Sequence, residues 1–404
     1  MFPIACDRVH TLAPTTDDVT RIKGGGIDPN YSKDFTAAMG IVPAMVTPMT
    51  PAKAIDYDGL RRLVDWHAGH EVSGIFLASG SGEYFLLTEN EVVEMASQII
   101  AHVDGGIPVL VGSTNHNECS ADLFYEKVNA YNAHPIVASL LGAEAAYDRD
   151  VAANIAMAQR VAAEGPDGIF VTTPRFIPYE KFSDWDPFDW ITAHGERSGE
   201  RYERLCADLD DLMVDYYTQV HDAVDVPVWG YELPGQIAGY KFSATAFAQL
   251  GALERMIAIK DTTISVAAIQ AKVEAALGSI QVLDANVENL PASLQVGASG
   301  AINTTSNVAP GLFVQLHRLV SNSDLTTAMA LHEQIMIVDH FLMDVGEYPL
   351  NAKVAVKSMG VRMGSYTRQN VTSYNLDRIR EMIGVIEQAT EDFEAPVPTG
   401  IMNV

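Results

Sequence analysis

Lys260 is the residue of this sequence with the clearest chemical potential, because it ends an apolar run. Residues 256–259 are all apolar and predict a buried strand, and Lys260 follows directly. Burial disfavours an ammonium ion, lowers its pKa and leaves a neutral amine that attacks carbonyl groups. Lys260 is therefore a candidate nucleophile, although a solvated lysine just past a strand is the alternative.

Tyr231 is the candidate partner of this amine. It closes a second apolar run, 226–230, and precedes Lys260 by 29 positions. One strand–helix–strand unit takes about 30 residues, so the two strands are expected to be parallel neighbours. Both side chains would then emerge at one edge of the sheet, where a phenol can relay protons. A packed tyrosine with a satisfied hydroxyl is the alternative.

A short turn, Gly80-Ser81-Gly82, follows another apolar run at 74–78. Two glycines let backbone N–H groups approach an anion closely, and the serine hydroxyl adds a donor. The turn is therefore predicted to bind a carboxylate. The alternative is a tight strand–helix turn that leads to a helix capped by Thr88.

Eight short apolar runs predict the framework that positions these residues. They lie at 40–47, 74–78, 107–111, 168–172, 226–231, 256–260, 280–283 and 300–303. Helical patterns lie between them, which argues for a parallel sheet covered on both faces. Eight such units predict a (β/α)₈ TIM barrel over residues 39–323. An open doubly wound sheet is the alternative, but no glycine-rich phosphate turn follows the first run.

Further segments surround this predicted barrel. Residues 1–38 are expected to form an N-terminal extension, and residues 324–404 a C-terminal helical segment with three helical stretches. Two insertions, near 115–150 and 181–204, exceed the usual length of a loop between elements. The second insertion is expected to form either a lid over the site or part of an interface.

Composition narrows the class of protein. The formal net charge is −26, from 52 acidic and 26 basic residues, which argues against binding to nucleic acid or to anionic membranes. The three cysteines have no disulfide or zinc spacing, and no apolar run reaches the roughly 18 residues needed to cross a bilayer. We expect a cytoplasmic protein. His67 and His70 have a metal-compatible spacing, but His67 shares the apolar face of its predicted helix, so no metal site is expected.

Several short motifs occur in an order that resembles a known family. They are Val46-Thr47-Pro48, Ser79-Gly80-Ser81-Gly82-Glu83, Tyr231-Glu232-Leu233-Pro234, Ile259-Lys260-Asp261, Gly300-Ala301-Ile302-Asn303 and Asn307-Val308-Ala309-Pro310. Over residues 39–370, apart from the insertions, the chain resembles the dihydrodipicolinate synthase/N-acetylneuraminate lyase family of class I pyruvate-type aldolases.

The resemblance implies a role for each matched residue. Lys260 would form a Schiff base with pyruvate or another 2-keto acid, and Tyr231 would shuttle protons. Gly80, Ser81 and Gly82 would hold the carboxylate of this substrate. The resemblance also implies that Thr47 supports this turn or the tyrosine, and that the backbone carbonyl of Ile302 lines the pocket. It implies no cofactor, and assembly as a homotetramer or homodimer.

Departures from the family pattern bear on the substrate. Gln236 stands where the synthase branch has an arginine, and Pro174-Arg175-Phe176 replaces a Pro-Tyr-Tyr element. Arg175 is expected either to bind an anionic group of the substrate or to form a surface ion pair. We therefore favour an aldolase or lyase that cleaves or forms a C–C bond of a 2-keto-3-deoxy sugar acid. Dihydrodipicolinate synthase, a sugar-acid dehydratase and a non-catalytic relative that binds keto acids are the alternatives. Asp284, Asn286 and Glu288 would either line the sugar end of the pocket or cap a helix.

Overall fold

The computed structural model describes residues 33–34, 36–114, 144–174, 200–232, 241–369 and 371–397. Residues 33–404 form one compact unit, and the statements below concern its described part. Arg175 and Gln236 lie outside the described residues, as do residues 1–32 and most of both predicted insertions.

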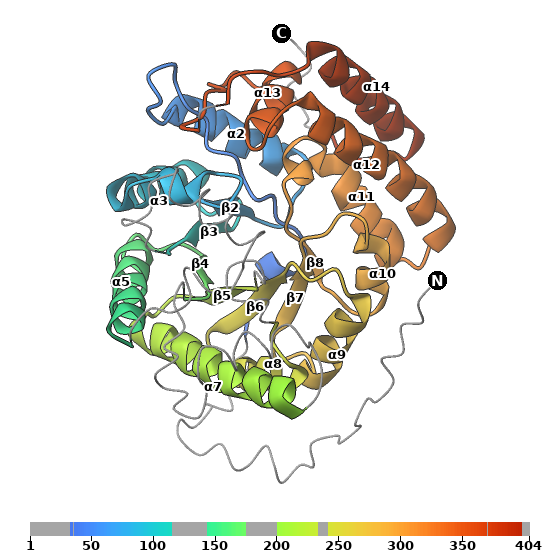
Figure 1. Ribbon diagram of the computed structural model, residues 1–404. Helices are drawn as coiled ribbons and strands as arrows, with labels where there is room; N and C mark the ends of the chain where they lie inside the picture. Colours follow the sequence, from blue (N-terminus) through green and yellow to red (C-terminus); the bar gives the residue numbers. More distant parts are fainter. Residues whose placement is uncertain are drawn as a thin grey trace. The chain divides into compact units, whose positions relative to one another are not determined.

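Eight parallel strands form a barrel and confirm the predicted fold class (Figure 1). They are β1 (Gly40–Ile41), β2 (Ile75–Leu77), β3 (Val109–Gly112), β4 (Gly168–Thr172), β5 (Val228–Glu232), β6 (Met256–Asp261), β7 (Gln281–Asp284) and β8 (Gly300–Ala301). The order β1-β8-β7-β6-β5-β4-β3-β2 leaves β1 and β2 at the two ends. A parallel bridge between Ala44 and Phe76 joins these ends.

The first strand is shorter than the predicted run of 40–47. Pro43 lies within this run and has no N–H group to donate to a ladder. The backbone nevertheless stays paired beyond it, because the amide of Ala44 donates to Asn303 and that of Met45 donates to Phe76. The predicted run therefore follows the extended, paired segment correctly, but only its first two residues form a regular strand.

Helices surround the sheet, as the alternation of patterns predicts (Figure 1). They are α2 (Tyr57–Gly69), α3 (Glu89–Val103), α5 (Glu144–Ala162), α7 (Glu200–Ala223), α8 (Ala244–Gly251), α9 (Val266–Ala276), α10 (Leu290–Gln295) and α11 (Pro310–Ser321). The helices α5 and α7 begin inside the stretches predicted as insertions, at Glu144 and Glu200.

Two helix starts follow from local sequence. The carboxylate of Asp56 accepts a hydrogen bond from the amide of Gly59 and caps α2. Thr88 and Glu91 form a reciprocal capping box at the start of α3. The cap at Thr88 was predicted, and both caps fix the turns that leave the barrel mouth after β1 and β2.

Three further helices complete the chain beside the barrel: α12 (Leu325–Val345), α13 (Leu350–Ser358) and α14 (Leu376–Asp392). In Figure 1, α12 lies between α11 and α14, and both pairs are in contact. The predicted C-terminal helices are thereby confirmed.

The end of the predicted N-terminal extension packs against the barrel. Ala38 is fully buried in a cluster of interior side chains that includes Phe76, Phe170 and Trp229. The ammonium group of Lys33 donates to the backbone carbonyls of Gly251, Met256 and Ser279 at 2.6–2.9 Å. These contacts fill the amino-terminal end of the barrel, opposite the ends of the strands that carry the candidate site.

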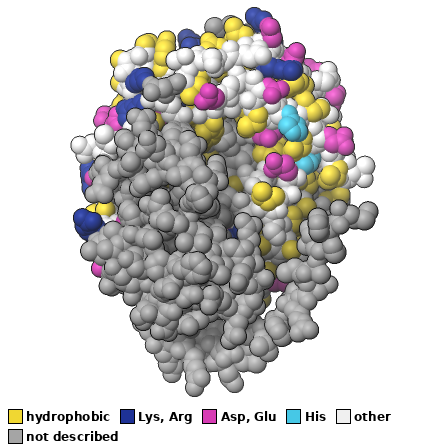
Figure 2. Space-filling view, viewed as in Figure 1, with side chains coloured by type: hydrophobic (Ala, Val, Ile, Leu, Met, Phe, Trp, Pro, Cys, Tyr) yellow, Lys and Arg dark blue, Asp and Glu magenta, His cyan; other side chains and the backbone are white. Residues whose placement is uncertain are grey.

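The described surface carries many acidic side chains (Figure 2), as the composition leads us to expect. On the described part of the face in Figure 2, Asp and Glu side chains are dispersed among apolar ones and do not gather in a single patch. Within the described ranges, no helix combines the length and the apolar character that crossing a membrane requires.

Candidate active site at the barrel mouth

Lys260 and Tyr231 are neighbours in the sheet. They are register partners on β6 and β5, so their side chains leave the same face of the sheet. The Nζ atom of Lys260 lies 3.4 Å from the hydroxyl of Tyr231 and 4.4 Å from the centre of its ring. The predicted pairing of an amine with a phenol is therefore present.

Burial changes the acidity of both groups. Lys260 is 7% exposed, and burial lowers its pKa to about 7. Burial also raises the pKa of Tyr231 to about 12, which keeps its phenol neutral near pH 7. At that pH about half of the Lys260 side chains carry a free amine, next to a hydroxyl that is able to donate.

The turn Gly80-Ser81-Gly82 is held by side chains of the segments that follow β1 and β2, Thr47 and Ser79. The hydroxyl of Thr47 donates to the carbonyl of Gly82 at 2.7 Å. A Cβ atom at Gly82 would lie 2.8 Å from the carbonyl oxygen of Met45, so this position requires glycine. Thr47 thus lies beside the turn, as predicted, and contacts its backbone.

Two amides of the turn are available to a ligand. The N–H groups of Gly82, Glu83 and Tyr84 all donate to backbone carbonyls within the turn. Those of Gly80 and Ser81 have no acceptor among the described residues. The Ser81 hydroxyl is 2.7 Å from that of Thr304, which follows β8. Adjacent free amides form a concave site for an anion, whereas the serine hydroxyl is already bound.

A hollow opens beside these groups at the carboxyl ends of β2 to β5. It encloses about 240 Å³ of space, part of which is open to solvent. It is lined by Phe76, Ala78, Gly80, Tyr84, Gly112, Thr114, Phe170, Thr172 and Tyr231. Gly80 and Tyr231 therefore line the same space, and Ser81 and Gly82 are not among its lining residues.

Ile302 contributes a buried side chain and a free carbonyl. Its side chain belongs to the interior cluster, and its amide donates to Asp284. The flanking carbonyls of Ala301 and Asn303 accept from the segment after β1, whereas that of Ile302 has no donor among the described residues. Ile302 is not among the residues that line the hollow, so the role of its carbonyl stays a prediction.

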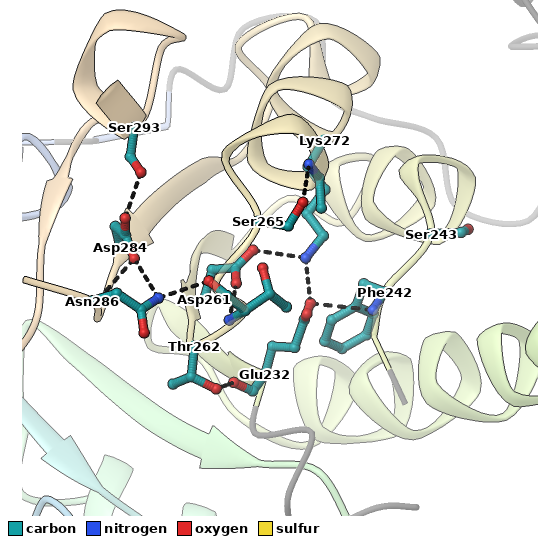
Figure 3. Close-up of polar contacts among 12 residues, drawn as sticks. Glu232, Phe242, Ser243, Asp261, Thr262, Ser265, Lys272, Asp284, Asn286 and Ser293 are labelled. Carbon is teal, nitrogen blue, oxygen red and sulfur yellow. Dashed lines mark hydrogen bonds and ion pairs between the residues drawn. The ribbon is translucent and has the colours of Figure 1, made fainter. Parts of the chain in front are cut away.

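A charged cluster outside the barrel fixes the strands that carry Tyr231 and Lys260 (Figure 3). The next residue on each strand, Glu232 on β5 and Asp261 on β6, points the other way. Lys272 of α9 donates to both carboxylates, at 2.6 Å and 2.7 Å, and all three side chains are buried. Its ammonium group therefore ties the ends of β5 and β6 together.

The charges of this cluster are unequal. Burial alone would lower the pKa of Lys272, but Glu232 and Asp261 outweigh it and raise that pKa. Burial raises the pKa of Glu232 to about 7, against the opposing effect of Lys272 and with a further rise from Asp261. One ammonium ion thus faces two carboxyl groups, and Glu232 takes up a proton near neutral pH.

Asp284 and Asn286 extend this framework and do not line the hollow. The Asp284 carboxylate accepts from the Ser293 hydroxyl of α10 at 2.5 Å and from Asn286. The Asn286 amide also donates to the carbonyl of Thr263, which links the loops after β6 and β7 (Figure 3). Neither prediction for Asp284 and Asn286 fits these contacts, because α10 follows Asn289 and has no side-chain cap.

A second buried ion pair joins the turn to the C-terminal helices. Glu83 follows Gly82, and its carboxylate binds the ammonium group of Lys353 in α13, with both side chains fully buried. The hydroxyl of Thr367 and the amide of Arg368 donate to the same carboxylate at 2.6 Å and 2.9 Å. The C-terminal segment therefore supports the predicted carboxylate site from behind.

The sequence patterns did not indicate the cluster of Lys272 or the ion pair of Lys353. Glu83 and Lys353 are 270 positions apart, so no local pattern connects them. Lys272 sits in an amphipathic helix, where a lysine normally signals a solvated face. Its spacing of 11 residues from Asp261 was the only available signal, and it is weak.

The histidine pair is packed, as predicted. His67 is fully buried on α2, and burial lowers its pKa to about 3. Burial likewise lowers the pKa of His70 to about 4, and its Nδ1 lies 2.8 Å from the carbonyl of Trp66. In the described part of the chain, no group of three or more His, Cys, Asp or Glu side chains could hold a metal ion.

Comparison with known proteins relates this chain to a single family. A model of the dihydrodipicolinate synthetase family matches residues 37–135 and 210–389. The 4-hydroxy-tetrahydrodipicolinate synthase of Ralstonia nicotianae is 23% identical over 330 residues, which cover 82% of this chain and 90% of that protein.

Solved structures have the same fold. A sialic acid aldolase of Ruminococcus gnavus, solved as a catalytic lysine mutant, superposes with a TM-score of 0.68 at 15% identity, covering 90% of this chain and 100% of that one. YagE of E. coli K12, a protein of the dihydrodipicolinic acid synthase family solved with pyruvate, has a TM-score of 0.63 at 21% identity. That match covers 87% of this chain and 98% of the other.

Substitution of Lys260 and substitution of Lys272 should change the free energy of unfolding in opposite directions. Lys260→Met should raise the free energy of unfolding at pH 7, by about 1–4 kcal/mol, because it removes an amine whose charged form the fold disfavours. Lys272→Met should lower it by about 3–5 kcal/mol, because it leaves two buried carboxyl groups without their cation.

Urea unfolding of both variants and the wild type at pH 7 measures this difference. The unfolded chain binds more protons at Lys260 than the folded chain between pH 7 and 10.5, so wild-type stability from this group should rise across that window. Equal destabilisation by the two substitutions would contradict the assignment of Lys260 as a strained amine.

Proposed function

Because the chain belongs to the dihydrodipicolinate synthetase family and is a lyase of the aldolase type, we propose that Lys260 forms an imine with a 2-keto acid. The observation that supports this most strongly is the buried amine, with its pKa lowered to about 7, at 3.4 Å from a neutral phenol. A neutral amine is the form that attacks a carbonyl.

The chemistry follows from the groups around the hollow. The Nζ lone pair of Lys260 attacks the keto carbon, and the keto oxygen leaves as water with both amine hydrogens. One further proton, taken from solvent through Tyr231, leaves the imine protonated. This imine accepts the electron pair released when the bond between C3 and C4 breaks. The C4 hydroxyl must lose its proton in that step, and C3 must gain one afterwards. Tyr231 relays these protons, and condensation is the same path in reverse.

The substrate carboxylate is assigned to the free amides of the turn. Gly80 and Ser81 offer two N–H groups, and Thr47, Glu83 and Lys353 hold the turn in place. Fixed donors of this kind orient the keto carbon toward the amine, and such positioning lowers the barrier of a bimolecular step. The carbonyl of Ile302, which has no donor among the described residues, is assigned as a further acceptor for the bound substrate.

The substrate proposed is pyruvate or a 2-keto-3-deoxy sugar acid. Gln236 stands where the synthase branch has an arginine, and Pro174-Arg175-Phe176 replaces its Pro-Tyr-Tyr element, which argues against dihydrodipicolinate synthase itself. That activity remains the second candidate, because the Ralstonia relative carries its name. Arg175 is a candidate for an anionic group of the substrate, and a homotetramer or homodimer in the cytoplasm remains our prediction.

Reduction with borohydride tests the imine directly. Wild-type protein mixed with pyruvate or with a panel of 2-keto-3-deoxy acids should gain the reduced mass of the keto acid on the peptide that contains Lys260. Lys33→Met is a matched control, because Lys33 has a pKa lowered to about 8 at the other end of the barrel. It should leave the adduct intact, whereas Lys260→Met should abolish it.

An adduct on another lysine, or none with any keto acid, would refute the proposal. Condensation of pyruvate with aspartate semialdehyde would identify the synthase. Stabilisation by keto acids without trapping would instead indicate a protein that only binds them.

Tyr231→Phe should separate imine formation from turnover. Loss of the phenol should lower kcat by about 10²–10⁴-fold, because a positioned proton donor contributes on that scale, while borohydride still traps the keto acid. Tyr216→Phe is the control, because the Tyr216 hydroxyl donates to the carbonyl of Thr172 outside the barrel. Turnover unchanged in Tyr231→Phe would remove its assigned role.

A further inference from the structure

Three strands place a hydroxyl, a phenol and an amine in one row. Thr172 on β4 pairs with Tyr231 on β5, which pairs with Lys260 on β6. Register partners on parallel strands face the same way, and neighbouring strands lie about 4.8 Å apart. Thr172 is therefore on the interior face, beside the two groups assigned to the imine chemistry, and it lines the same hollow as Tyr231.

A second threonine completes this end of the row. Thr114 follows β3, and its Oγ1 accepts from both the hydroxyl and the amide of Thr172, each at 3.0 Å. Thr114 also lines the hollow, and the two side chains are 9% and 7% exposed. They form a buried hydroxyl pair in a wall that also presents Phe76, Ala78, Phe170 and two tyrosines, Tyr84 and Tyr231.

The hydroxyl of Thr114 keeps one hydrogen that makes no hydrogen bond within the described residues. A hydroxyl has two lone pairs and one hydrogen. Thr172 occupies both lone pairs of the Thr114 oxygen, so the hydrogen of Thr114 is the free one, and its direction is set by the two bonds already made. This hydrogen has no acceptor within the described residues. A buried donor left unpaired is costly, so a ligand oxygen is the natural partner.

We infer that Thr114, oriented by Thr172, donates a hydrogen bond to an oxygen on the carbon chain of the substrate beyond its keto carbon. The inference rests on the proposed function. There, the turn serves the carboxylate, and Lys260 with Tyr231 serves the keto carbon. The remaining donor therefore selects a keto acid that carries a chain hydroxyl, as sugar acids do, over an aliphatic keto acid.

Two six-carbon ligands separate this role from imine formation. Trapping with borohydride gives a half-saturating concentration for 2-keto-3-deoxygluconate and for 2-ketohexanoate, which has no hydroxyl groups. Wild-type protein should prefer the hydroxylated acid by at least about tenfold, since a site built around a hydrogen bond rejects a ligand that lacks it. Thr114→Val should reduce this preference about tenfold, through weaker binding of 2-keto-3-deoxygluconate alone.

Three further variants make the test specific. Thr114→Ser keeps the hydroxyl and should stay within about threefold of wild type. Thr172→Val keeps the bond from the amide of residue 172 to Thr114 and removes only the orienting hydroxyl, so an intermediate loss is expected. Ser113→Ala is the matched control, because the buried Ser113 hydroxyl donates to the carbonyl of Phe170 at 3.2 Å and does not line the hollow.

Thr114→Val also leaves the amide of Thr172 without its acceptor, so the thermal midpoint of each variant is measured with and without pyruvate. Pyruvate trapping retained on Lys260 shows that the site is intact. Equal changes for both six-carbon acids, or no change in any variant, would overturn the role of Thr114 and leave the imine mechanism standing. Failure of the wild type to trap any keto acid would remove both.

Discussion

The proposed chemistry depends on the burial of one amine, Lys260, that has no carboxylate partner among the described residues. Among the described residues three lysines are buried, and each has a different environment. Lys272 contacts Glu232 and Asp261, and Lys353 contacts Glu83, so both stay close to compensating charge. The Nζ atom of Lys260 has one hydrogen-bond partner among the described residues, the phenol of Tyr231. Its charged form is disfavoured, and the free amine is correspondingly accessible to chemistry at neutral pH.

Successive side chains of each strand point to opposite faces of the sheet, and the two faces have different roles. The inward positions of β4, β5 and β6 carry Thr172, Tyr231 and Lys260, while the following positions, Glu232 and Asp261, face α9. The outer face holds the charges that fix the register, and the inner face keeps neutral groups close together. The ion cluster of Lys272 can therefore position the amine of Lys260 although the cluster lies outside the barrel.

Parts of this arrangement could be predicted from sequence because they are local. The end of the run 256–259 placed Lys260, the interval of one strand–helix–strand unit placed Tyr231, and the glycines marked the turn at Gly80. The structure confirms the barrel and brings these residues together. The length of β1 was wrong, because Pro43 interrupts a run that periodicity alone reads as continuous.

Other parts could not be predicted because they depend on contacts between distant segments. Glu83 meets Lys353 only after the whole barrel has formed. Thr114 gave no signal, since threonine is common in strands and its role appears only when Thr172 occupies both of its lone pairs.

The pKa of Lys260 is the most direct test of the central claim. Protein labelled with ¹³C-lysine can be titrated by NMR, following the Cε signal that disappears in Lys260→Met. The account predicts a midpoint near pH 7 for this signal, while exposed lysines titrate near 10.4. A midpoint near 10 for Lys260 would mean that its ammonium ion is well solvated, and the proposed nucleophile would then lack its physical basis.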